Sequence, residues 1–259
     1  MQPRKLRSTL MLLGLIFAPL SQAQPVIKFG VDPSYPPFEQ KQPDGSLSGF
    51  DIDLGNALCA ELQVKCIWVE QTFDGMIPGL KAKKFDAILS AFSATAARRQ
   101  QVDFSDRIYT APSSLVARKD SGLLPTAESL KGKSVGVVQG TLHESFARSH
   151  WGNQGVSILT YQTQDQVFSD LINGRLDATF QASVQADVGL LQKPQGQAFA
   201  FAGAPITDKS IIGDGVAIGV RKNEPELKAQ LNTALASIRQ SGEYDQIAKK
   251  YFNFDIYGE

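Results

Sequence analysis

The stretch VKCIWVEQTFDGMIPGLKAKKFDAILSAF, residues 64–92, decides the fold class. An apolar run at 64–70 precedes a helical segment at 75–84 and a second apolar run at 85–92, which predicts strand, helix and strand in that order. Because consecutive parallel strands need a crossover, usually a helix, this alternation indicates an α/β protein with a mostly parallel sheet covered by helices.

The same alternation extends through the rest of the chain. Leu54, Leu58 and Leu62 recur every four positions behind acidic residues, which predicts an amphipathic helix at 51–62. The other expected elements are strands at 26–31, 113–119, 133–140, 156–161, 177–181 and 216–220, and helices at 141–147, 165–175, 226–240 and 243–252. Two α/β lobes are the simplest packing, and ligands in such folds bind beyond the carboxyl ends of the strands.

The first 23 residues have the layout of a cleavable secretory signal. Arg4, Lys5 and Arg7 precede an apolar run at 10–20 and a small-residue site that ends at Ala23. The apolar run is shorter than the roughly 20 residues that span a membrane. We therefore expect a signal peptide at 1–23 and a mature chain in the periplasm.

Charge and cysteine usage exclude several classes of protein. Lys+Arg and Asp+Glu both total 26, so neither nucleic acid nor an anionic membrane is an expected partner. Cys59 and Cys66 are the only cysteines, and an oxidising compartment favours a local disulfide between them over two buried thiols. His143 and His150 lie far from them in sequence, and we expect no metal site and no cofactor.

Polar residues follow the apolar run at 85–92. Ser90, Ser93, Thr95 and Arg98 suit a carboxylate, since a guanidinium offers a planar fork of donors and hydroxyls add single hydrogen bonds. In the alternative interpretation, Thr95 only caps a helix and Arg98 is a solvated charge in its first turn.

Two other segments contain candidate binding residues, each with an alternative. Gly140 and Thr141 lie where a strand gives way to a helix, so free N–H groups there suit an anion, although Thr141 could be an ordinary cap. The loop after the first strand carries Asp32, Tyr35 and Phe38, and Phe73 precedes the helix at 75–84. Such aromatics can line a pocket for a planar cation that pairs with an acidic side chain, or they can simply pack in the core.

Seven motifs together resemble one family over essentially the whole mature chain. They are GVDPSYPPF (30–38), GFDIDLGNALC (49–59), the segment 64–95, RRQQVDFSD (98–106), LKGKSVGVVQGT (130–141), GRLDA (174–178) and YDQIAKKYFNFDIYGE (244–259). The chain resembles the lysine/arginine/ornithine-binding and histidine-binding proteins of bacterial ABC importers. The resemblance implies a two-lobe periplasmic binding protein fold with two hinge strands and a cleft that closes on one ligand.

The resemblance also implies a domain division and partners. One lobe would comprise residues 24–110 and 214–259, and the other residues 111–213 with the hinge segments. The partners would be a small ligand with a carboxylate and the membrane permease of an ABC importer, and the protein would be a monomer. In that family the two cysteines that match Cys59 and Cys66 form a disulfide.

On the carboxylate side of the ligand, the resemblance assigns roles to matching residues. The arginine that matches Arg98 clamps the ligand α-carboxylate, and the serine that matches Ser93 assists it. Backbone N–H groups near Thr141 and Leu142 complete that part of the site.

On the side-chain end of the ligand, the matching residues are aromatic and acidic. Aromatics that match Tyr35 and Phe73 sandwich the ligand side chain. The acid that matches Asp32 takes a distal basic group, and the serine that matches Ser90 lines the same pocket.

Three positions depart from the family pattern, all on the amino side of the expected ligand. Ala182 stands where an aspartate accepts hydrogen bonds from the α-ammonium, Ala91 replaces a serine, and Leu142-His143 replaces Thr-Gln. A buried ammonium that loses its carboxylate costs about 3–5 kcal/mol, or about two to four decades of affinity.

The loss of the aspartate leaves two interpretations of the ligand. A ligand with a substituted α-nitrogen, such as an opine of the octopine or nopaline type or a cyclic imino acid, needs fewer acceptors there, and His143 or a backbone amide could meet an opine's second carboxylate. Alternatively Gln181, Asp177 or a water replaces the aspartate, and the protein binds arginine or ornithine.

An enzyme of the same fold is the competing function class, because cyclohexadienyl dehydratases look like this fold converted to catalysis. Such an enzyme needs an acid or base poised at the substrate. The cleft segments offer Asp32, His143 and hydroxyls but no nucleophile–base pair and no metal set. We therefore expect a binding protein that catalyses no reaction.

Overall fold

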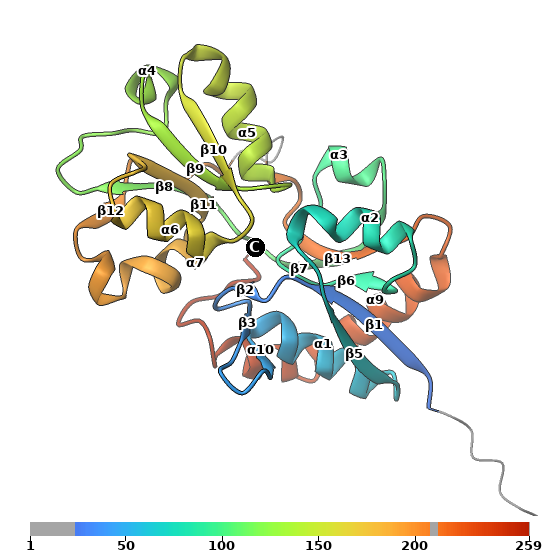
Figure 1. Cartoon of the computed structure of the whole chain (residues 1–259). Coiled ribbons are helices and arrows are strands. Elements are labelled where there is room, and N and C mark those ends of the chain that lie inside the picture. Colours follow the sequence, from blue (N-terminus) through green and yellow to red (C-terminus); the bar gives the residue numbers. More distant parts are fainter. Residues whose placement is uncertain (1–23, 208–211, 259) are drawn as a thin grey trace, which may run out of the picture.

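The computed structural model describes residues 24–207 and 212–258, and the predicted signal peptide at 1–23 lies outside them. The described chain forms two α/β lobes, each built on a five-stranded sheet (Figure 1). The lobes lie side by side, and the chain passes between them after β7 and again before β13 (Figure 1). No described helix combines the length and the apolar character that crossing a membrane requires.

The first lobe contains the sheet β5-β1-β6-β13-β7. Its strands are β1 (Val26–Val31), β5 (Lys65–Glu70), β6 (Ala87–Ile88), β7 (Asp103–Tyr109) and β13 (Val216–Val220). Strand β1 pairs in parallel with β5 and β6, whereas β13 pairs antiparallel with β6 and β7. One strand is thus reversed in a sheet that otherwise runs in one direction, and it is the strand on which the chain returns from the second lobe.

The second lobe repeats this arrangement with the sheet β10-β9-β11-β8-β12. Its strands are β8 (Ser113–Arg118), β9 (Ser134–Val138), β10 (Ser157–Tyr161), β11 (Ala178–Ala182) and β12 (Phe199–Phe201). Strand β9 pairs in parallel with β10 and β11, and β8 pairs antiparallel with β11 and β12. The reversed strand is again the one that receives the chain from the other lobe.

Helices cover the faces of both sheets (Figure 1). They are α1 (Phe50–Glu61), α2 (Met76–Lys81), α3 (Ala96–Arg99), α4 (Ala127–Leu130), α5 (Leu142–His150), α6 (Gln164–Ile172), α7 (Ser183–Ala186), α9 (Pro225–Gln240) and α10 (Glu243–Ala248). Short turns are η1 (Phe73–Gly75), η2 (Gly152–Gln154), η3 (Asp187–Leu191) and η4 (Pro194–Gly196).

Several local predictions differ from the structure, including β12 and α4, which were not expected. The segment 33–49, expected as a loop, contains the small sheet β2 (Ser34–Tyr35), β3 (Glu39–Lys41) and β4 (Leu47–Ser48). The strand expected at 85–92 shrinks to β6, because the chain leaves the sheet and Ala91 adopts a positive φ of 44°. Strand β7 was missed, since its polar residues do not alternate regularly with apolar ones.

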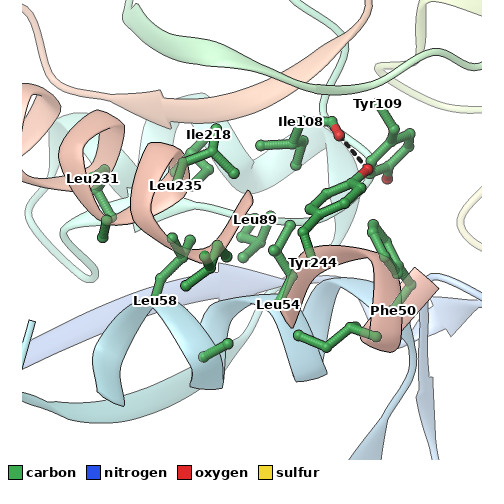
Figure 2. Packing of buried hydrophobic residues seen from close by; sticks show 14 of the residues in the cluster. Phe50, Leu54, Leu58, Leu89, Ile108, Tyr109, Ile218, Leu231, Leu235 and Tyr244 are labelled. Atoms are coloured by element: carbon green, nitrogen blue, oxygen red, sulfur yellow. Dashed lines mark hydrogen bonds between the residues drawn. The ribbon is translucent and has the colours of Figure 1, made fainter. Parts of the chain in front are cut away.

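The core of the first lobe packs α1, α9 and α10 (Figure 1) behind the sheet and loops that carry the binding residues. Leu54 and Leu58 of α1 are fully buried and pack with Leu231 of α9 in one apolar cluster (Figure 2). Burying each leucine stabilises the fold by about 1.5–3 kcal/mol. The Tyr244 hydroxyl donates to the Ile108 carbonyl at 2.6 Å, which ties α10 to the end of β7 (Figure 2).

A disulfide links Cys59 near the end of α1 to Cys66 in β5. The predicted pairing is confirmed, and the structure excludes the alternative of two buried thiols. The link fastens a helix to the edge strand of the first sheet.

Candidate functional site

A cavity lies between the lobes. The residues to which the resemblance assigns a ligand role line it, except Ala182, whereas the further candidates Phe38, Thr95 and Gly140 do not. The first lobe contributes Asp32, Ser34, Tyr35, Glu39, Phe73, Ser90, Ala91, Ser93 and Arg98, and the second lobe contributes Val138, Thr141, Leu142, His143 and Gln164. The segments that these residues come from are distant in sequence; those of the first lobe are hydrogen-bonded to one another, and the second lobe completes the wall.

Arg98 is buried in this cavity rather than solvated. It retains only 8% of its accessible surface, and its guanidinium lies 4.3 Å from the Phe92 ring centroid and 5.1 Å from that of Phe73. Nη1 donates to the Ser93 carbonyl at 2.9 Å, and Nη2 donates across the cleft to the Gly140 carbonyl at 3.2 Å. Burial lowers the pKa of Arg98 to about 9, so the group stays cationic at neutral pH.

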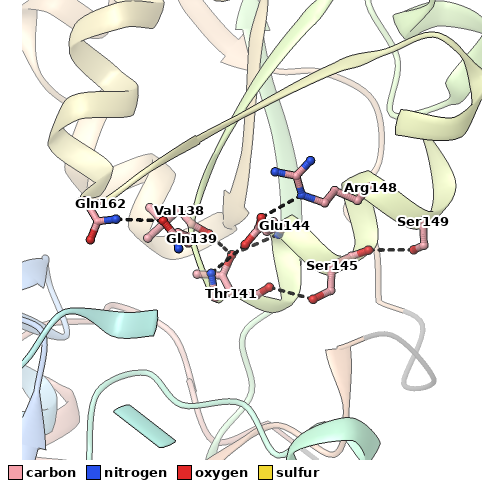
Figure 3. A network of polar contacts seen from close by, with 9 residues as sticks. Val138, Gln139, Thr141, Glu144, Ser145, Arg148, Ser149 and Gln162 are labelled. Carbon is pink, nitrogen blue, oxygen red and sulfur yellow. Dashed lines mark hydrogen bonds and ion pairs between the residues drawn. The ribbon is translucent and has the colours of Figure 1, made fainter. Parts of the chain in front are cut away.

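Both threonines that the sequence analysis singled out are helix caps. The Thr95 hydroxyl accepts from the Arg98 N–H at 3.3 Å, so Thr95 caps the helix as the alternative interpretation predicted. That interpretation was wrong in making Arg98 a solvated charge, because Arg98 is buried. The Thr141 hydroxyl accepts from the Glu144 N–H at 3.1 Å at the start of α5 (Figure 3). Thr141 caps the helix and lines the cavity, but the N–H groups expected to be free for an anion are engaged, since the Thr141 N–H donates to the Val138 carbonyl at 3.4 Å and the Gly140 N–H to Glu144.

Gly140 brings the second lobe into contact with the first. Its φ of 76° suits glycine, and a Cβ built there would lie 2.7 Å from the Asp74 Cα. A larger residue at this position would therefore push the lobes apart. The Gly140 N–H donates to a Glu144 carboxylate oxygen at 2.8 Å, which holds this turn against α5.

Asp32 and Ser90 form the acidic part of the wall. The Asp32 carboxylate accepts from the Ser34 hydroxyl at 2.7 Å and from the Phe73 N–H at 3.0 Å. The Ser90 hydroxyl accepts from the Asp32 N–H at 3.0 Å and donates to Glu39 Oε1 at 3.0 Å. Burial raises the pKa of Asp32, and its two hydrogen bonds oppose that shift.

His143 belongs to the neutral part of the wall. Its Nε2 lies 3.0 Å from the Ser113 hydroxyl, and its ring meets the Phe180 ring edge-on with centroids 5.2 Å apart. Burial, with a contribution from the nearby Arg98 charge, lowers the pKa of His143 to about 3. The imidazole is therefore neutral at physiological pH.

Ala182 lies just behind the cavity wall. Its backbone N–H donates to the Tyr35 hydroxyl at 3.2 Å, so this position joins the two lobes without lining the cavity. The acid that could have replaced the missing aspartate is engaged elsewhere, since Asp177 accepts from the Ser134 N–H and pairs with Lys133. Gln181 accepts from Thr179 and also lies outside the wall.

The sequence of the whole described chain matches one known family with this two-lobe architecture. The model of the bacterial extracellular solute-binding proteins, family 3, matches residues 27–254. The chain belongs to this family.

This solute-binding protein is similar to named amino-acid-binding proteins over nearly its full length. It is 49% identical to the lysine/arginine/ornithine-binding periplasmic protein of Escherichia coli (strain K12) over 251 residues, 96% of each chain. It is 42% identical to the L-arginine-binding protein of Pseudomonas aeruginosa over 246 residues, 95% of each chain. These matches confirm the predicted resemblance and the periplasmic location.

Solved structures confirm the two-lobe fold. A Salmonella typhimurium periplasmic binding protein described for its high arginine specificity has a TM-score of 0.81 at 34% identity, over 88% of this chain and 100% of that one. An ancestral amino-acid-binding protein described as a precursor of cyclohexadienyl dehydratase has a TM-score of 0.77 at 30% identity, over 88% and 96%. The comparisons favour solute binding, although one protein with this fold is described as the precursor of an enzyme.

Sequence reasoning missed four residues of the wall in this solute-binding protein: Ser34, Glu39, Val138 and Gln164. Glu39 is the most consequential, because it adds a second acid from β3 and is only 1% exposed. Gln164 is equally buried and carries an uncharged amide at the start of α6. The Pro-rich and Gly-rich surroundings of Glu39 predicted a loop, so nothing local signalled its burial.

Proposed function

We propose that this solute-binding protein captures a guanidinium-bearing amino-acid derivative whose α-nitrogen is substituted, with octopine as the model compound. The observation that carries the proposal is the distribution of charge around the cavity. Arg98, Asp32 and Glu39 all come from the first lobe, whereas the second lobe contributes no charged side chain to the described wall.

The first lobe offers complementary groups for both ends of such a ligand. Arg98 has five N–H donors, and two of its nitrogens donate to protein carbonyls, which leaves donors for a ligand carboxylate. Asp32 and Glu39 supply acceptors for a guanidinium. Tyr35 and Phe73 provide aromatic surface for the stem and the planar cation between these groups.

The neutral wall of the second lobe supports a substituted α-nitrogen. A free α-ammonium would meet only the uncharged side chains of that lobe, and an unpaired buried charge costs about 3–5 kcal/mol. In an opine, a second carboxylate lies next to the secondary ammonium and offsets its charge within the ligand. Such a ligand requires hydrogen bonds from the second lobe rather than an acid.

A basic amino acid such as arginine or ornithine is the second candidate. The relatives named for lysine, arginine and ornithine binding support it. Gln164 would then be the neutral acceptor for the α-ammonium, since it lines the cavity and the other two candidates, Gln181 and Asp177, do not.

The wider function follows from the family. We propose that the closed protein delivers its ligand to the membrane permease of an ABC importer, and that it acts as a monomer in the periplasm after loss of residues 1–23. We further propose that it catalyses no reaction. His143 Nε2 contacts the Ser113 hydroxyl, but burial lowers the pKa of this imidazole to about 3 and Ser113 does not line the described wall, so no nucleophile–base pair faces the ligand.

A thermal-shift panel on ligand-stripped mature protein tests this function. A ligand at 100 times its Kd adds about 2.7 kcal/mol, which raises the Tm of a chain this size by about 5–10 °C. Octopine and nopaline should stabilise the protein more than arginine, ornithine, lysine or histidine. Stabilisation by the basic amino acids alone would establish the second candidate, and stabilisation by none would contradict both. Mass spectrometry of the recovered ligand should show it unaltered, whereas an enzyme would change it.

A further inference from the structure

We propose that Glu39 and Asp51 share a single proton at the floor of the cavity and that a cation bound beside Glu39 expels it. Ligand capture would then be coupled to proton release. This inference rests on the proposed function only in taking the ligand to be a cation.

The hydrogen bonding of the two acids leaves one oxygen of each without a donor, where a shared proton would fit. Glu39 Oε1 accepts from the Ser90 hydroxyl, and Asp51 Oδ2 accepts from the Ala91 N–H at 2.7 Å and from the Tyr109 hydroxyl at 3.3 Å. The remaining oxygens, Glu39 Oε2 and Asp51 Oδ1, are buried and have no donor within the described chain. Asp51 lies directly beside the Glu39 segment, because its backbone N–H donates to the Phe38 carbonyl at 2.9 Å and its carboxylate accepts from Ala91, the residue after Ser90. One proton between them satisfies both oxygens at once.

The surroundings of this pair favour one retained proton. Among the described residues, the titratable groups that face the pair are Asp32 after β1, Tyr35 of β2, Tyr109 of β7 and Tyr244 of α10, and none of them is a cation. Burial and the charge of Asp51 raise the pKa of Glu39, and burial raises the pKa of Asp51. Both side chains are at most 1% exposed, so a second buried charge beside the first is unfavourable.

The position of Glu39 links this proton to the ligand. Glu39 lines the cavity, whereas Asp51 lies behind it at the start of α1, so a bound cation faces Glu39. The protonated carboxyl of Glu39 would lose its O–H proton to solvent, and the cation would take its place as the partner of the carboxylate. One proton is released for each cation bound, and a neutral ligand releases none.

This coupling predicts how affinity depends on pH. While the pair holds its proton, release of one proton on binding lowers the Kd tenfold for each unit rise in pH. His143 lines the same cavity but does not contribute between pH 5 and 8, because its pKa is lowered to about 3. Arg98 keeps its charge over that range.

Calorimetry with L-arginine and octopine as probes measures the proton directly. Titrations at pH 6.5 in phosphate and in Bis-Tris, which both buffer there and differ in ionisation enthalpy, should give close to one proton released by the wild type and close to none by Glu39→Gln. Glu61→Gln is the matched control, because Glu61 is an exposed acid at the end of α1. No release by the wild type, or unchanged release by Glu39→Gln, would overturn the inference.

Infrared spectroscopy of the ligand-free protein tests the shared proton without any ligand. A C=O stretching band of a protonated carboxyl should be present in the wild type at pH 6.5, shift in D₂O and disappear in Glu39→Gln. Absence of that band in the wild type overturns the inference even if both probes bind. A band that is lost in Glu39→Gln, together with binding of neither probe, refutes the proposed ligand class while the shared proton stands.

Discussion

Restoring an acid at position 182 should reverse the preference between a free and a substituted amino group. Ala182 is 5% exposed, precedes α7 and donates its N–H to Tyr35. In Ala182→Asp the new carboxylate would stand at the boundary between the lobes, on the side where the described wall carries no charge. It would pair with the α-ammonium of arginine and repel the second carboxylate of octopine.

The magnitude follows from the cost of an unpaired buried charge. Pairing the α-ammonium should recover about 3–5 kcal/mol, which is about two to four decades of affinity for arginine. Isothermal titration of both ligands against wild type, Ala182→Asp and Ala182→Asn measures this change, and the asparagine variant matches the shape without the charge. A ratio of arginine to octopine affinity that stays within about threefold of wild type in Ala182→Asp would refute the reasoning.

Three further predictions concern other contacts. In Arg98→Lys the planar fork and the stacking 4.3 Å above Phe92 are lost, and calorimetry should show ligand affinity reduced by about 10- to 150-fold, since a hydrogen bond to a charged group contributes about 1.5–3 kcal/mol. In Tyr35→Phe the hydrogen bond to Ala182 is lost, and stopped-flow measurements should show that the ligand dissociates about 2- to 10-fold faster. An unchanged dissociation rate would show that this hydrogen bond does not stabilise the closed state. In Cys59→Ser the closed loop, with a sequence separation of 7, is opened, so calorimetric stability should fall by about 2.5 kcal/mol and ligand affinity should not change.

The sequence predicts the parts of the fold that depend on local pattern. The apolar runs at 26–31 and 216–220 are strands of the first sheet, because period and composition act within each segment. Strand β6 is shorter than its apolar run, because the turn at Ala91 depends on the Asp51 carboxylate, which accepts the Ala91 N–H from a distant helix. Local pattern contains no information about that contact.

The candidate site, like the fold, can be predicted only in part from the sequence. Arg98 stands out as a cation after a strand, but its burial results from Phe73, Phe92 and the approach of Gly140, which are separate in sequence. Glu39 gave no signal at all, since its burial depends on Ser90 and on α1 packing behind β3.

The separation of charge between the lobes leads to an expectation about how the protein closes. The first lobe holds every charged residue of the described wall, so it can bind both ends of a zwitterionic ligand before the second lobe arrives. The second lobe then adds neutral contacts, including the Gly140 carbonyl on Arg98 and the Ala182 N–H on Tyr35. We therefore expect substitutions in the first lobe to change whether a ligand binds at all. Substitutions at the second-lobe contacts should mainly change how long the closed form lasts, because those contacts form only after capture.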